Sequence, residues 1–540
     1  MATIEVILAL ILAVTLVAAL ARFLPVPLPL LLIAAGVLLC FVPGFSGVHI
    51  DPATFFVLFI PPLLFADGWL MPRRDFKKVL RPVLLLAFGL VLATVVVVGY
   101  ALHALVPGLP LAAAFALGAI VSPTDAVATA AMTERLPLPA RVTLILNGES
   151  LINDASGLVA FKFALAALAT GAFSLWEAGG ELVLVAAGGT VVGIVVAYCI
   201  GVLRQGVHRV SGEMPGVQTM LSLLTPFAAY LAAETVHASG ILAIVAAGLY
   251  AGWHDARNVG TRTRQQALQV WYTVLFVFNG LVFLLLGLSL PQAIVALAAR
   301  QPWTTLALQA GVLWFLVTVI RLVWVYPGTY LPPALFPSIR RREPVRDPRG
   351  VFIVGWAGLR GSVTMAAALS LPLVTAAGAP FPGRDEIIFL SATTILLTLL
   401  INGLTLPPLI RALGVRGDGG AERELRAGEI ALAQAAAAAL HRELPKLAGA
   451  AERGFAERLL DDYSRRVETH TANAERRLHL DGVAAAHRRL VLLAIAAERT
   501  ELATLRDEGV INDETARTLE WRIDHAELYA AGPVQGHGHG

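Results

Sequence analysis

One short stretch of the chain places four polar side chains that could handle ions inside a long apolar segment. Residues 144–157 include Glu149, Ser150, Asn153 and Asp154. On a helix, Ser150 and Asp154 share one face, and Glu149 and Asn153 share the next. Ionisable groups at membrane depth are costly and mark ion or proton pathways. A helix end with capping residues is the alternative, but the apolar residues continue past Asp154, which favours an ion pathway.

The composition is that of a membrane protein. Hydrophobic residues make up 57% of the chain and charged residues 15%, whereas a soluble domain has about 25% charged residues. The mean hydropathy is +0.72. Cys40 and Cys199 both lie in apolar runs, so the sequence has neither a disulfide framework nor the cysteine spacing of a metal site. We therefore expect an all-α polytopic membrane protein without a cofactor.

Windows of about 20 apolar residues predict about 13 transmembrane helices. They lie near residues 4–22, 28–43, 53–71, 82–106, 111–133, 143–168, 179–203, 217–236, 239–254, 266–290, 304–326, 350–372 and 386–413. An odd number of spans permits two inverted six-helix repeats, spans 1–6 and 8–13, joined by span 7.

Charge indicates the orientation and the domain division. Alternate loops are basic, among them those with Arg73, Arg74, Lys77, Lys78 and Arg81 and with Arg340, Arg341 and Arg342. The positive-inside rule makes these loops cytoplasmic, with the N-terminus outside and the C-terminal tail inside.

From Gly417 onward the chain has 16 basic and 21 acidic residues, whereas the part before Gly417 has 25 basic and 17 acidic residues. We expect a transmembrane domain over 1–415 and a cytoplasmic helical tail, with a helix break at Pro445, over 416–540.

Two predicted spans are interrupted near their middles. Residues 118–125 contain Pro123, which removes a helical hydrogen bond, and residues 355–361 contain three glycines around Arg360. Irregular backbone at membrane depth survives only where it lines a cavity or is buried in protein. We expect crossed broken helices, although Pro123 alone could be a packing kink.

The oxygen atoms near these breaks suit a small monovalent cation. Thr124 and Asp125 follow Pro123, and Ser150 and Asp154 lie on the neighbouring span. The sequence has no His/Cys cluster that would indicate a transition metal. We predict cation and proton binding at these four residues.

The motifs resemble those of the sodium/hydrogen exchanger family, and the bacterial branch is the nearer match. They are Ser-Pro-Thr-Asp125, Asn-Gly-Glu-Ser-Leu-Ile-Asn-Asp154, Gly-Leu-Arg-Gly361 and Pro61-Pro-Leu-Leu-Phe65, and the likeness extends over residues 1–415. Many members have an acidic residue directly after the last motif, where this chain has Ala66. Asp67 follows one position later, so we expect it at the cytoplasmic mouth rather than in the ion site.

The resemblance implies roles for the site residues. Asp154 would alternately hold the proton and the cation, and Asp125, Ser150 and Thr124 would be further ligands of Na⁺. Three residues would support the site, with Glu149 bonding Asn153 and pairing with Arg360. The family architecture implies a homodimer with spans 1–3 and 8–10 at the interface and spans 4–6 and 11–13 as a mobile core.

We therefore predict a Na⁺/H⁺ antiporter of the bacterial inner membrane, not an enzyme, which serves pH and sodium homeostasis. Desolvation of a buried carboxylate favours its protonated form, so a proton and a cation exclude each other at Asp154. Asn153 cannot carry a proton, which predicts electroneutral 1:1 exchange. K⁺ or Li⁺ could replace Na⁺ at the same site.

Two other classes of protein fit the sequence less well. A channel would need rings of like residues or repeated filter loops. An intramembrane aspartyl hydrolase could use Asp125 and Asp154 as acid and base, but it explains neither Asn153 nor Arg360.

The expected partners of the chain are membrane lipids, and no nucleic acid partner is expected. Lys162 either extends to the outer membrane surface or pairs with another charged group, and the same two alternatives apply to Arg321 near the cytoplasmic end of its span. Glu234, near an outer end, is a candidate funnel residue.

Overall fold

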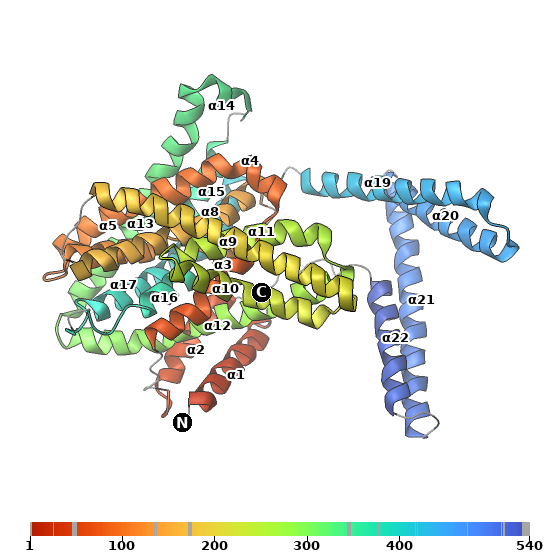
Figure 1. Ribbon diagram of the computed structural model, residues 1–540, viewed down its shortest axis with the longest axis horizontal. Coiled ribbons are helices and arrows are strands. Elements are labelled where there is room, and N and C mark those ends of the chain that lie inside the picture. The colour runs from red at the N-terminus through yellow and green to blue at the C-terminus, as the bar shows by residue number, and fades with distance from the viewer. Residues whose placement is uncertain are drawn as a thin grey trace. The chain divides into compact units, whose positions relative to one another are not determined.

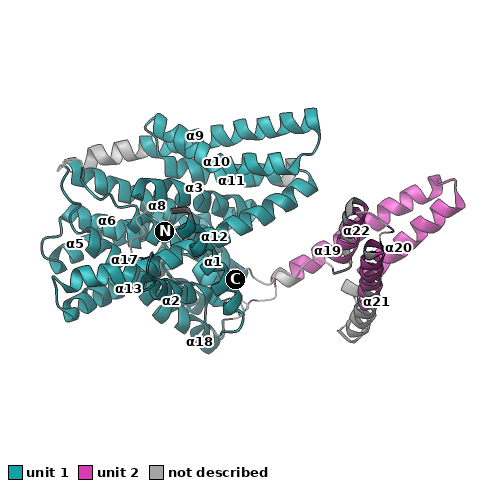
Figure 2. Cartoon of the chain, turned by 90° about the horizontal axis from the view of Figure 1, so that it is seen from below, with its two compact units in different colours: residues 1–416, 540 teal, residues 417–539 magenta. Residues whose placement is uncertain are grey.

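The computed structural model describes residues 3–24, 26–45, 51–133, 136, 138–170, 175–342, 347–375, 378–415, 417, 420–471, 474–508, 510 and 513–531. The chain forms two compact units, residues 1–416 and residues 417–539 (Figure 2). All the long regular elements of the described residues are helices, which confirms the predicted all-α class.

Seven helices of the first unit pack into what we call the scaffold bundle (Figure 1). Its members are α1 (Thr3–Ala21), α2 (Leu28–Cys40), α3 (Pro52–Leu70), α9 (Leu175–Ser211), α10 (Pro215–Thr235), α11 (Gly240–Asn258) and α12 (Thr261–Ala298). The helices α2 and α12 approach so closely at Gly36 that a Cβ atom there would lie 2.1 Å from the carbonyl oxygen of Leu284. A glycine is therefore required at Gly36.

The remaining long helices form the broken-helix bundle. One continuous span comprises α4 (Arg73–Leu84), the π-helix η1 (Leu85–Leu90) and α5 (Val91–Leu105), and another comprises α17 (Arg384–Leu397), the π-helix η2 (Thr398–Gly403) and α18 (Leu404–Leu413). The unbroken members are α8 (Ala140–Thr170) and α13 (Trp303–Leu335), and the short helix α14 (Pro337–Arg342) follows α13.

Two members of the broken-helix bundle are interrupted where the sequence predicts it. The first consists of α6 (Leu111–Val121) and α7 (Ala126–Thr133), bent by 41°. The second consists of α15 (Pro348–Trp356) and α16 (Ser362–Leu369). Pro123 has no N–H to continue α6, and the glycines at residues 355–361 weaken the helix between α15 and α16.

The length and hydropathy of the helices are those of a multi-pass membrane protein. Among the described residues, eight helices are long and apolar enough to cross a membrane, and the bent pair of α6 and α7 adds a ninth. The predicted spans near 4–22 and 28–43 fall on shorter apolar helices, and the one near 350–372 falls on α15 and α16. The count of about 13 spans and the inverted repeats stay predictions.

The second unit consists of helical pairs. Its elements are α19 (Gly420–Glu443), the 3-10 helix η3 (Leu444–Lys446), α20 (Ala450–Thr471), α21 (Ala474–Asp507) and α22 (Asp513–Ala531). The predicted break at Pro445 falls in η3, between α19 and α20. Arg499 on α21 contacts Asp524 at 2.6 Å and Glu527 at 2.5 Å on α22. These exposed ion pairs align the last two helices of the chain.

Candidate functional site

The two helix breaks meet, and Asp125 joins them. Its backbone N–H donates to the carbonyl oxygen of Leu359 over 2.8 Å. Its carboxylate accepts from the backbone N–H of Ala128 at 2.9 Å, in the first turn of α7, and from that of Ser362 at 3.1 Å, at the start of α16. Helix N-termini present free N–H groups and a partial positive charge. The carboxyl group of Asp125 therefore caps two half-helix N-termini at once.

Gly361 makes this contact possible. A Cβ atom at this position would lie 1.6 Å from Oδ2 of Asp125. Only a residue without a side chain lets the carboxylate approach the start of α16 so closely. The three-glycine motif thus has a steric reason in addition to its effect on the helix.

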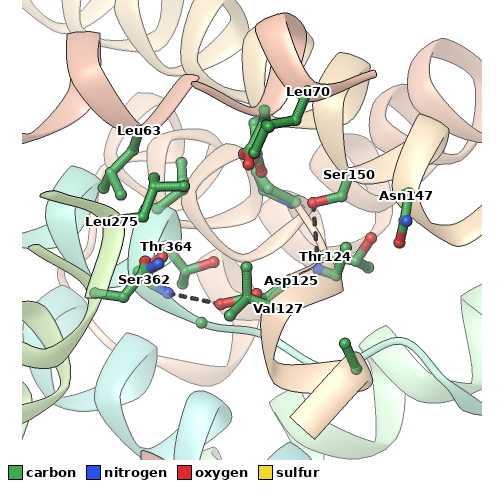
Figure 3. Close-up of a pocket in the computed structure, with 18 of the residues that line it drawn as sticks. Leu63, Leu70, Thr124, Asp125, Val127, Asn147, Ser150, Leu275, Ser362 and Thr364 are labelled. Atoms are coloured by element: carbon green, nitrogen blue, oxygen red, sulfur yellow. Dashed lines mark hydrogen bonds between the residues drawn. The ribbon is translucent and has the colours of Figure 1, made fainter. Parts of the chain in front are cut away.

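The helix α8 lies beside this crossing and contributes the polar stretch. The hydroxyl of Ser150 accepts from the backbone N–H of Ala126 over 3.3 Å (Figure 3). Asn153 donates from its side-chain amide to the hydroxyl of Thr124 at 2.8 Å, and that hydroxyl donates to Glu149 at 3.4 Å. We expected Glu149 to bond Asn153 directly. Instead, Thr124 lies between them and connects α8 to the break in the first broken helix.

A cavity of about 240 Å³ is lined by all four predicted ligands, Asp154, Asp125, Ser150 and Thr124 (Figure 3). It extends from Asp154 past Ser150 and Asn147, toward the end of the bundle where α8 begins and α3 ends. Asp154 is only 3% exposed. Within the described part of the chain it has no hydrogen bond or ion pair. Its carboxylate is therefore free to take up a proton or a cation from the cavity.

The ion pair of Glu149 differs from the expected one. Its partner is Arg321 of α13, which donates from both terminal nitrogens, with Nη2 at 2.9 Å from Oε2. Both side chains are 1% exposed. Arg321 also donates to the carbonyl oxygens of Val354 at 2.9 Å and of Gly355 at 3.1 Å, near the end of α15. Of the two alternatives for Arg321, the structure therefore supports pairing and not extension to the membrane surface.

Arg360 has a different role from the predicted one. Its Nε donates to the carbonyl oxygen of Val121 over 2.6 Å, at the end of α6, and its Nη1 to that of Gly358 over 2.7 Å. Unpaired carbonyls at a helix C-terminus carry partial negative charge. Arg360 and Arg321 thus each stabilise the C-terminal end of one half-helix. The predicted pairing of Arg360 with Glu149 is wrong, because Arg321, which lies on the preceding predicted span, occupies that place.

Sequence reasoning did not assign five further polar residues of the cavity wall to the site. They are Asp67 of α3, Asn147 of α8, Asn279 of α12, and Ser362 and Thr364 of α16. Asp67 was expected at the mouth, but it shares one cavity with Asp125 and Asp154. The position of Asp67 just after the Pro-Pro motif of α3 was the sequence feature that could have indicated a place in the cavity wall. For Asn279 the sequence offers no such feature, because a single amide in an apolar helix does not indicate which helices pack beside it.

Of the two alternatives for Lys162, the structure supports pairing, because Lys162 forms an ion pair with Glu234. Nζ of Lys162 lies 2.5 Å from Oε1 of Glu234. The pair connects α8 with α10.

Comparisons with known proteins agree with the fold and the motifs. The profile of the family described as sodium/hydrogen exchanger, transmembrane, matches residues 9–412. A sodium, potassium, lithium and rubidium/H⁺ antiporter of Bacillus pumilus is 36% identical over 94% of this chain and 75% of its own length. An uncharacterised Na⁺/H⁺ exchanger of Escherichia coli is 37% identical over 93% of this chain and 94% of its own length.

A solved structure shares the fold. The sodium proton antiporter MjNhaP1 of Methanocaldococcus jannaschii superimposes with a TM-score of 0.56 at 18% identity, over 76% of this chain and 98% of that one.

Proposed function

Because the chain belongs to the sodium/hydrogen exchanger family, we propose that it is a secondary active antiporter that exports Na⁺ in exchange for H⁺ across the bacterial inner membrane. Such proteins are transporters and not enzymes. One observation carries the assignment of the site: Asp154 is buried, lines a cavity and has no hydrogen bond or ion pair among the described residues. A carboxylate in this position can be neutralised by a proton or by a cation, but not by both.

The other ligands follow from which oxygen atoms remain available. The hydroxyl of Thr124 is engaged by Asn153 and Glu149, so we assign its contribution to the backbone carbonyl. Ser150 accepts one hydrogen bond from Ala126 and keeps a second lone pair. Asp125 already accepts from two backbone N–H groups, so it serves as a fixed charge beside the cation. Hard monovalent cations prefer such oxygen ligands.

The supporting residues hold this arrangement. Asn153 fixes Thr124, Glu149 is neutralised by Arg321, and Arg360 stabilises the end of α6. None of these three ion-site neighbours (Asn153, Glu149, Arg360) lines the cavity. In the proposal they position the ligands and do not change protonation during the cycle.

The sidedness follows from the charged loops. The basic residues at the start of α4 follow directly after the end of α3, toward which the cavity extends. The positive-inside rule makes this side cytoplasmic, which puts the N-terminus outside and the tail inside. The structure then represents a state in which the ion site faces the cytoplasm.

We further propose a homodimer through the scaffold bundle. Leu8, Leu12 and Leu16 form a stripe along α1 and are 58–62% exposed, so a second copy or lipid must cover them. Light scattering in detergent measures the mass of the protein and so distinguishes a dimer from a single chain covered by lipid; a mass of one chain would contradict the dimer.

We also propose that the physiological role of the protein is pH and sodium homeostasis.

K⁺/H⁺ exchange at the same site is the second candidate. The Bacillus pumilus relative is named for sodium, potassium, lithium and rubidium, which supports a site with several substrates. Proteoliposomes that contain a pH-sensitive dye distinguish the candidates when Na⁺, K⁺, Li⁺ and Rb⁺ are added separately. We expect Na⁺ to release protons at the lowest concentration, and a preference for K⁺ would favour the second candidate.

The same assay tests the competition mechanism. If proton and cation exclude each other at Asp154, the half-maximal Na⁺ concentration should rise as the pH falls and level off at high pH. The maximal rate should be regained at saturating Na⁺. A pH change that alters only the maximal rate would contradict competition for one carboxylate.

A further inference from the structure

The ion pair of Lys162 and Glu234 joins the two bundles. Lys162 belongs to α8, which carries Asp154, and Glu234 belongs to α10 of the scaffold bundle. Nζ of Lys162 also lies 5.5 Å from the ring centre of Tyr230 on α10 and 5.9 Å from that of Phe56 on α3. One side chain of the ion-carrying bundle therefore contacts an anion and two aromatic faces of the scaffold bundle.

This contact lies on the other side of the ion site from the cavity. Along α8 the cavity is lined by Asn147, Ser150 and Asp154, all toward the start of the helix. Lys162 follows Asp154 by eight residues, a rise of about 12 Å toward the end of the helix. On α3 the cavity is lined by residues from Leu63 onward, whereas Phe56 precedes them. The ion pair thus lies on the side of the ion site to which the cavity does not extend.

We propose that Lys162 and Glu234 are positioning residues that close the route on the outer side and that this contact breaks when the ion site opens there. The inference rests on the proposed function, in which the ion site faces one side of the membrane at a time. Opening the outer side requires α8 to separate from α3 and α10 at the level of Lys162. The ion pair therefore stabilises only the cytoplasm-facing state, because it is broken in the outward-facing state.

The exposed fractions of the two side chains indicate how strongly loss of the ion pair should shift the equilibrium between the two states. The side chains are 38% and 41% exposed, and exposed pairs change an equilibrium by roughly two- to fivefold. An interaction present in one state only shifts the populations of the two states by that factor. The apparent affinity for a cation on one side is reduced by the fraction of protein that faces the other side. Loss of the pair should therefore weaken apparent Na⁺ affinity on the inner side and strengthen it on the outer side.

The ratio of the two apparent affinities is the informative quantity, because it changes by the full shift of the equilibrium. We suggest measuring it in oriented proteoliposomes for the wild type, Lys162→Gln, Glu234→Gln and the exchanged double variant with Lys162→Glu and Glu234→Lys. Each single variant should change the ratio by about two- to fivefold in the same direction. The exchanged pair should restore it to near the wild-type value.

Asp75→Asn provides a matched control. Asp75 forms an exposed ion pair with Lys78 at 2.7 Å, but both residues lie on α4, so this variant loses a salt bridge within one helix and should leave the ratio unchanged. An unchanged ratio in both single variants, or equal weakening on the two sides, would overturn the inference and indicate a structural role only. Failure of the proposed function is distinguishable, because the wild type itself would then show no cation-dependent proton flux.

Discussion

Glu149 and Arg321 form a buried, two-pronged ion pair that connects α8 to α13. Removing one partner of a buried pair leaves an uncompensated charge at a cost of about 3–5 kcal/mol. We expect Glu149→Ala and Arg321→Ala each to lower the melting temperature in detergent strongly. The double variant should lose clearly less than the sum, because the two changes remove the same interaction.

Arg360→Ala is the control for this cycle. Its effect should be coupled to that of Glu149→Ala much more weakly than the effect of Arg321→Ala is, because Arg360 donates to the carbonyls of Val121 and Gly358 and not to the carboxylate. Strict additivity for Arg321 and strong coupling for Arg360 would instead restore the pairing that the motifs suggested.

The second prediction concerns the titrating group. Asp154→Asn keeps the shape of the side chain and removes the charge, so cation-dependent proton flux should fall to background. Folding should persist, because Asp154 has no hydrogen bond or ion pair to lose among the described residues. Vesicle transport and thermal unfolding of the same preparation measure both. Substantial exchange by this variant would contradict competition at Asp154.

The third prediction concerns Gly361. A methyl group at this position would lie 1.6 Å from Oδ2 of Asp125, so Gly361→Ala should displace the carboxylate, destabilise the protein and abolish transport. Gly311→Ala is the matched control on α13, since a Cβ atom there meets no atom within 4 Å. It should be neutral or stabilising by up to about 1 kcal/mol. Equal behaviour of the two variants would argue against the close contact at Asp125.

The fourth prediction is electroneutral exchange of one cation for one proton. Moving one charge through the membrane potential involves about 2.3 kcal/mol per 100 mV, so an unbalanced cycle must respond to voltage. Asn153 cannot titrate, and we expect Asp125, which accepts from two backbone N–H groups, to stay ionised throughout the cycle. A potential set with K⁺ and valinomycin should therefore leave the rate of Na⁺/H⁺ exchange unchanged, provided that K⁺ is not itself transported.

A clear voltage dependence would identify a second titrating group in the cavity. Asp125 would be the first suspect and Asp67, which lines the same cavity, the second. Asp67→Asn separates them: restored voltage independence in this variant would assign the second proton to Asp67.

The fifth prediction concerns the tail, for which we propose a regulatory role. Residues 417–539 form a compact unit of their own. Truncation after about Arg416 should shift the pH at which transport begins and leave the apparent Na⁺ affinity unchanged. Complete loss of transport in a well-folded truncated protein would contradict this division.

Local chemistry explains which parts of the site the sequence predicts. Pro123 and the glycines at residues 355–361 break their helices through properties of single residues, so the breaks follow from the sequence. Ser150 and Asp154 share a helix face because of helical periodicity alone. These features require no knowledge of which helices are neighbours.

The contacts that the sequence did not predict all depend on packing between distant segments. Arg321 and Glu149 are separated by 172 positions, and nothing in the sequence near either residue specifies the other. Lys162 and Glu234 are 72 positions apart, and each alone resembles a charge at the end of a span. The sequence did not predict that Asp67 lines the same cavity as Asp154, because one step along α3 rotates a side chain by about 100° and only the neighbouring helices decide which face meets the cavity.

The carboxylate of Asp125 also has a mechanical consequence. It bonds the first turn of α7 with one oxygen and the start of α16 with the other, so neither half-helix can move away without breaking a hydrogen bond. A cation that draws on this carboxylate pulls on both half-helices simultaneously. The crossing therefore couples the two half-helices mechanically, and we expect a displacement of this one carboxylate to act on α7 and α16 together.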